Sequence, residues 1–157
     1  MVTAQRTLTI NAAFLQEIKE DNRELRHLLD ESAALMERLR GAIELRRAAE
    51  MLEKLRDQLG MHFSLEEAYG YFDDAIDVAP RLSRKAEELR SQHPQLFLAL
   101  CELVEEAEQL VYHERPSVDA GDLSRGFTRF LRQLQQHEAQ EDALIIRSLN
   151  EEIGGGD

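Results

Sequence analysis

The chain has no tryptophan, one cysteine and three prolines among its 157 residues. The lone Cys101 excludes a disulfide within the chain and is typical of a reducing compartment. Few helix breakers and an abundance of Leu, Glu, Arg and Ala favour an all-α protein. No stretch approaches the roughly 20 apolar residues of a membrane span. We therefore expect a cytoplasmic protein.

Positive charge is also scarce, because 19 Lys and Arg stand against 31 Asp and Glu, for a net charge of −12 at pH 7. Such a surface repels phosphate groups, which argues against nucleic acid and anionic membranes as partners. The length is that of one domain, with enough chain to bury a core without disulfides. No nucleophile triad or phosphate-binding loop is present, so nothing indicates an enzyme acting on an organic substrate.

Apolar residues recur at three- and four-residue spacing, which predicts helices over 11–40, 43–75, 81–113 and 123–150. Proline removes a backbone hydrogen bond, so we expect either a kink at Pro94 or a new helix beginning there. The apolar pattern keeps its phase across Pro94 and favours the kink. Short loops between four helices predict an antiparallel up-down four-helix bundle. Residues 1–10 are expected to form a flexible arm and 151–157 a flexible tail around a bundle of residues 11–150.

Two His-x-x-x-Glu pairs lie on the second and fourth predicted helices, as His62–Glu66 and His137–Glu141. Residues four apart share one face of a helix. In both cases that face also carries the apolar residues of the helix. The two pairs are therefore expected to point into the core.

The predicted turns place a third histidine, His93, at the same height along the bundle axis as His62 and His137. In antiparallel helices, two residues equally far from the turn between them lie side by side. The midpoint of His62 and His93 falls near residue 78, and that of His93 and His137 near residue 115, and both midpoints are predicted loops. The two glutamates lie one helical turn away, roughly 6 Å along the axis. Imidazoles and carboxylates that converge in this way form a metal site suited to a transition metal such as iron.

The first predicted helix offers Asn22 at this height. His27 lies on a face shared with glutamates, which is a solvated face, whereas Asn22 lies in the apolar stripe at the height of His62. Its amide could hydrogen-bond a ligand or a water. Tyr69 follows Glu66 on its stripe, where it either covers the site or packs in the core.

On the fourth predicted helix, Asp142 is an alternative to Glu141 as the carboxylate that accompanies His137 in the site. Asp142 lies about 140° around the helix from His137, whereas Glu141 lies about 40° away, so Glu141 is favoured. Glu67 and Glu138 are expected on solvated faces.

The pattern resembles that of the hemerythrin-like (HHE cation-binding) domains. These carry a His on helix 1, His-x-x-x-Glu on helices 2 and 4, and a His on helix 3. The resembling segments are Asp21–Arg26, His62–Glu67, Gln92–His93, His137–Asp142 and Glu152–Asp157. The resemblance implies a four-helix bundle that holds a non-haem di-iron centre. The implied ligands are His62, His93 and His137, with Glu66 and Glu141 bridging the irons.

Two departures reduce the nitrogen donors of this implied site. Asn22 stands where the family usually has a histidine, and Phe97 stands where oxygen-carrying hemerythrins have a second helix 3 histidine. The site would hold two irons with waters, one iron, or no metal. The resemblance implies a sensor, store or scavenger of oxygen, nitric oxide or peroxide, and peroxide scavenging is the one enzyme activity in question. The alternative is a metal-free bundle that binds a protein partner.

Overall fold

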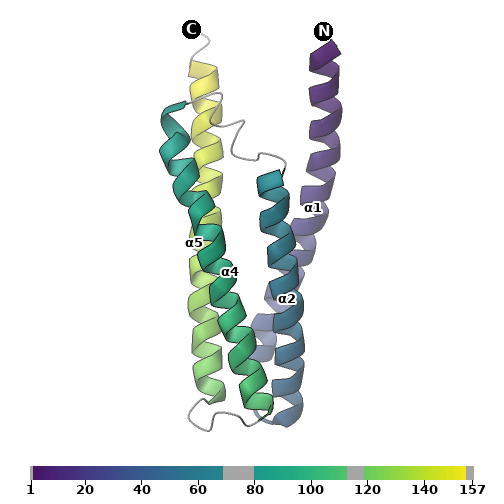
Figure 1. Cartoon of the computed structure of the whole chain (residues 1–157), viewed down its shortest axis with the longest axis vertical. Helices are drawn as coiled ribbons and strands as arrows, with labels where there is room; N and C mark the ends of the chain where they lie inside the picture. Colours follow the sequence, from purple (N-terminus) through teal and green to yellow (C-terminus); the bar gives the residue numbers. More distant parts are fainter. Residues whose placement is uncertain (1, 69–79, 113–118, 155–157) are drawn as a thin grey trace.

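The computed structural model describes residues 2–68, 80–112 and 119–154. Its elements are α1 (Val2–Met36), α2 (Ala42–Ala68), a short 3₁₀ helix η1 (Pro80–Leu82), α4 (Ser83–Val111) and α5 (Ala120–Gly154). The four long helices run side by side in alternating directions, with both ends of the chain at the same end of the bundle (Figure 1). The predicted all-α, up-down four-helix bundle is confirmed.

Some helix ends differ from those predicted. The first helix begins at Val2 rather than near Asn11. Residues 2–10 contain neither glycine nor proline, and an asparagine inside a helix costs less than about 1 kcal/mol, so the helix extends past Asn11 toward the N-terminus. The last helix continues past Asn150 to Gly154. The end expected near residue 75 lies outside the described residues.

The helix α4 is continuous through Pro94. The alternative of a new helix starting at this proline is therefore wrong. Pro94 is exposed, so the N–H that proline lacks is missing on the solvent side of the helix.

The apolar stripes of the helices meet in two buried clusters. The larger one runs from Leu25 and Met36 on α1 to Phe127 and Phe130 on α5. The smaller one comprises Leu82, Ala86, Leu89 and Leu144. Phe127 and Phe130 are each 2% exposed and lie in the core. None of the helices in the described ranges is long and apolar enough to cross a bilayer.

Leu100→Ala is expected to lower the free energy of unfolding by about 2–5 kcal/mol, because Leu100 is fully buried and its loss leaves a cavity. Leu98→Ala on the same helix is the matched control, since Leu98 is 60% exposed and a surface change costs less than about 0.5 kcal/mol. Urea denaturation of the two variants measures the difference. Equal losses would contradict the core described here.

Candidate metal centre

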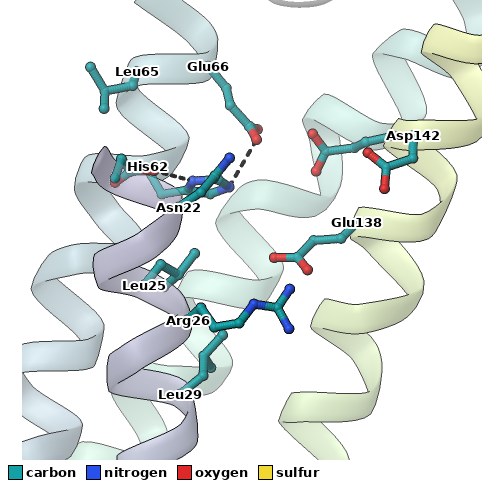
Figure 2. Close-up of a pocket in the computed structure, with 11 residues that line it drawn as sticks. Asn22, Leu25, Arg26, Leu29, His62, Leu65, Glu66, Glu138 and Asp142 are labelled. Carbon is teal, nitrogen blue, oxygen red and sulfur yellow. Dashed lines mark hydrogen bonds and ion pairs between the residues drawn. The ribbon is translucent and has the colours of Figure 1, made fainter. Parts of the chain in front are cut away.

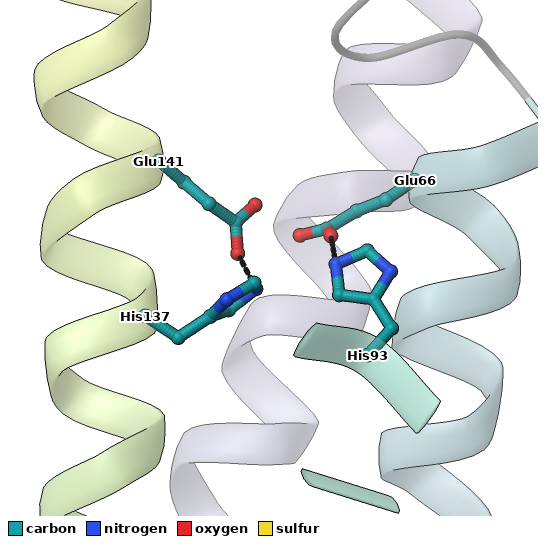
Figure 3. A group of neighbouring side chains, drawn as sticks. All are labelled: Glu66, His93, His137 and Glu141. Atoms are coloured by element: carbon teal, nitrogen blue, oxygen red, sulfur yellow. Dashed lines mark ion pairs between the residues drawn. The ribbon is translucent and has the colours of Figure 1, made fainter. Parts of the chain in front are cut away.

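Four buried side chains from three helices converge between the two apolar clusters. Glu66 comes from α2, His93 from α4, and His137 and Glu141 from α5 (Figure 3). One ligand atom from each lies within 4.8 Å of those of the other three. The rings of His93 and His137 are 5.0 Å apart between centroids. These two histidines therefore lie at the same level along the bundle axis, as the positions of the turns predict.

Glu66 lies between two imidazoles. Its Oε1 is 2.9 Å from Nε2 of His62, and its Oε2 is 3.2 Å from Nε2 of His93. On α5, Nε2 of His137 contacts Oε1 of Glu141. All three histidines thus present the same ring nitrogen, Nε2, to a buried carboxylate.

The other ring nitrogen of His62 faces Asp21 of α1. The distance from His62 Nδ1 to Asp21 Oδ2 is 2.5 Å, and the Gln58 amide donates to the second oxygen of Asp21 at 2.7 Å. Asp21 is only 7% exposed. A carboxylate held beside Nδ1 keeps the proton on that nitrogen and leaves the Nε2 lone pair for a metal.

The two remaining histidines show the same arrangement. His93 Nδ1 is 3.1 Å from Oε1 of Glu67, and His137 Nδ1 is 2.8 Å from Oε1 of Gln92. Phe63 stacks on the His93 ring at 4.1 Å between centroids, with 8° between the planes. Metal-bound histidines commonly donate their second N–H to such an oxygen, which fixes the ring orientation. The rings are therefore oriented for a ligand at the centre.

Several buried inward-facing atoms are held only in the ion pairs described above and make no hydrogen bond among the described residues. They include Oε2 of Glu66, Nε2 of His137 and Oε1 of Glu141. A buried polar atom without a hydrogen bond is costly and is uncommon in native proteins. A cation between these atoms would satisfy all of them. A donor set of imidazole nitrogens and carboxylate oxygens fits a transition metal such as iron.

The buried charges also favour a cation. Burial and the neighbouring Glu66 carboxylate raise the pKa of Glu141 to about 9. Burial lowers the pKa of His62, but the hydrogen bonds with Asp21 and Glu66 outweigh it and raise that pKa to about 10. Protons thus balance the buried carboxylates in the protein alone, and a metal cation would compete with them.

The pKa of His137 moves in the opposite direction. Burial and the nearby His93 ring lower it to about 4. His137 is therefore neutral at pH 7, which is the state in which an imidazole binds a metal.

The remaining predicted site residues lie at the margin of the centre. Asn22 lines a pocket beside it (Figure 2) but is exposed. The α1 side chain that contacts a proposed ligand is its buried neighbour Asp21. His27 is exposed and pairs with Glu31 at 3.0 Å, as its predicted solvated face implies. Tyr69 lies outside the described residues.

The acidic residues next to the predicted ligands differ in their surroundings. Glu141 is 3% exposed, whereas Asp142 is exposed and lines the pocket. Glu138, predicted to be solvated, is half-buried and lines the same pocket. Glu67 is half-exposed, but it contacts His93 from outside the centre.

Comparison with known proteins adds one finding. A family model described as the hemerythrin HHE cation binding domain matches residues 13–154, which is most of the chain. No curated protein and no solved structure matches the chain.

Proposed function

This chain belongs to the hemerythrin HHE cation-binding domain family, and we propose that it binds iron and, through the iron, oxygen, nitric oxide or peroxide. The observation that carries the proposal is the common orientation of His62, His93 and His137. Each turns Nε2 toward a buried carboxylate and has a side-chain oxygen at Nδ1. Such an arrangement turns Nε2 of each histidine toward a carboxylate, and this nitrogen would bind a metal in place of a proton.

The proposed ligands are the three histidines and the carboxylates of Glu66 and Glu141, which together would hold the iron. An iron with an open coordination position supplies the affinity for a small diatomic molecule or for peroxide. Asn22, at the margin of the pocket beside the centre, is proposed to hydrogen-bond such a ligand or a water. This chemistry suits a sensor, a store or a scavenger.

The test is the metal content and absorption spectrum of untagged protein, produced with iron and purified without chelator. Two irons per chain with near-ultraviolet charge-transfer bands are expected. One iron would keep the function and reduce the centre to a single ion. An absence of metal, with no uptake on reconstitution, would overturn the proposal in favour of a metal-free bundle that binds a protein partner. Spectral change on adding nitric oxide or peroxide then identifies the ligand.

Gln92→Leu is expected to weaken iron binding about 10- to 100-fold, the usual cost of losing an outer partner of a metal-bound histidine. The reason is that Gln92 Oε1 lies 2.8 Å from Nδ1 of His137 and holds that ring. Gln95→Leu is the matched control, because Gln95 lies about one turn further along the same helix and is exposed. Competition with a chelator of known affinity measures both. Equal affinities in the two variants would show that Gln92 does not position His137.

A further inference from the structure

A pocket of about 200 Å³ lies beside the centre, between α1, α2 and α5 (Figure 2). Five carboxylates from these three helices line it: Asp21, Glu66, Glu138, Glu141 and Asp142. Arg26 is the one lysine or arginine among the lining residues. The pocket is therefore rich in carboxyl groups, which attract a cation where they are ionised.

The floor of this pocket is formed by proposed metal ligands. Glu66 is 6% exposed and Glu141 is 3% exposed, yet both line the pocket. Oε2 of Glu66 and Oε1 of Glu141 are buried, and each makes an ion pair with a histidine Nε2 but no hydrogen bond among the described residues. An ion that crosses the pocket therefore reaches buried carboxylate oxygens beside imidazole nitrogens, which together form a donor set for a transition metal.

The outer part of the pocket is acidic too. Asp142 is exposed and Glu138 is half-buried, and both project from α5 into the pocket, across from Glu66 (Figure 2). Carboxyl groups thus line the pocket from its solvent-exposed opening to the buried ligands at its inner end. This gradient of burial would let an ion exchange its waters for carboxylate oxygens in steps.

A second pocket touches the centre from the other side and has a different chemistry. It lies between α4 and α5 and is lined by glutamines, Leu96 and the ring of His137. The glutamines are Gln92, Gln95, Gln133, Gln136 and Gln140. Neutral amides do not concentrate cations as carboxylates do. Of these two pockets, only the first is built to attract a metal ion.

We propose that the acidic pocket is the route by which a divalent metal ion reaches the centre, with Glu138 and Asp142 drawing it in. The proposal rests on the metal binding proposed above. Substitution of a residue along the route changes the rates of metal association and dissociation by the same factor. Substitution of a metal ligand instead changes the equilibrium affinity. Because the attraction is electrostatic, salt should weaken it.

The experiment is stopped-flow uptake of Co²⁺ by the metal-free full chain, followed by visible absorption. The double variant Glu138→Gln/Asp142→Asn is expected to take up Co²⁺ about 5- to 10-fold more slowly at low salt, a modest share of the 10- to 1,000-fold effect of steering. The difference should shrink at 0.5 M salt, and the dissociation constant should stay within about threefold. Arg26→Ala should speed uptake, because it removes the cation at the pocket.

The control is Asp57→Asn/Glu105→Gln, which removes the same charge from exposed positions on α2 and α4. Uptake by the control at the slowed rate, or by the pocket variant at the parent rate, would overturn the proposal. A loss of affinity at an unchanged rate of association would overturn it as well, since Glu138 or Asp142 would then be a ligand. If the parent takes up neither iron nor Co²⁺, the proposed function itself fails, which is a separate result.

Discussion

Glu66→Gln is expected to abolish tight iron binding, with a loss of affinity of more than about 100-fold. Loss of an outer partner alone costs up to about 100-fold, and Glu66 lies inside the centre. Its two oxygens face Nε2 of His62 and Nε2 of His93 at 2.9 and 3.2 Å. Glutamine keeps the shape but removes the charge and one oxygen. Metal content after dialysis against a weak chelator measures the loss.

The matched control for this variant is Glu50→Gln, which makes the same change at an exposed position of the same helix. It should retain the parent metal content. The far-ultraviolet circular dichroism of both variants should match the parent, which separates loss of metal from loss of fold. Parent stoichiometry in Glu66→Gln would show that the metal is bound elsewhere.

The height of the site could be predicted from the sequence because it depends only on the turns. An antiparallel bundle fixes which residues lie side by side once each loop is located, and prolines mark two of the loops. His93 and His137 lie far apart in sequence, yet their rings are 5.0 Å apart. The spacing of His-x-x-x-Glu pairs likewise fixes a face without knowledge of packing.

The face of the first helix was harder to predict. Leucines at 15, 25 and 29 place the centre of the stripe near Asn22. The structure instead buries Asp21, Leu25, Leu28 and Ser32, a face rotated by about one residue. Asp21 and Ser32 carry no hydrophobic signal, and Asp21 is buried because it pairs with His62 and Gln58 on another helix. A contact of this kind depends on how helices pack, which periodicity does not reveal.

The outer partners of the other histidines were missed for the same reason. Glu67 follows Glu66 and should point away from the core by helix geometry, yet its side chain reaches His93 on α4. Gln92 precedes His93 but bonds to His137 on α5. Both contacts join different helices. The sequence therefore predicts which histidines and glutamates converge, but not what orients the rings.

Saturation with iron is expected to raise the melting temperature by about 8–16 °C. A ligand at about 1,000 times its dissociation constant stabilises the native state by about 4.1 kcal/mol, and each kcal/mol is worth about 2–4 °C in a chain of this size. The physical source is the pair of buried carboxyl groups, Glu66 and Glu141, where a cation would replace the protons that balance their charge. Thermal unfolding with Fe²⁺ under anaerobic conditions measures the gain, and a chelator should reverse it.

Two comparisons show whether the gain comes from the centre or from the acidic surface. With a net charge of −12, the protein attracts any divalent cation weakly, and this alone would produce a small, salt-sensitive shift. Mg²⁺ prefers six oxygen ligands in near-octahedral geometry and is poorly matched to a site rich in imidazole, so at the same concentration it reports only the surface effect. Glu66→Gln should lose the iron-dependent gain and keep the Mg²⁺ response of the parent. Equal shifts with both ions would place the stabilising cations on the surface, because only the buried imidazoles distinguish iron from magnesium.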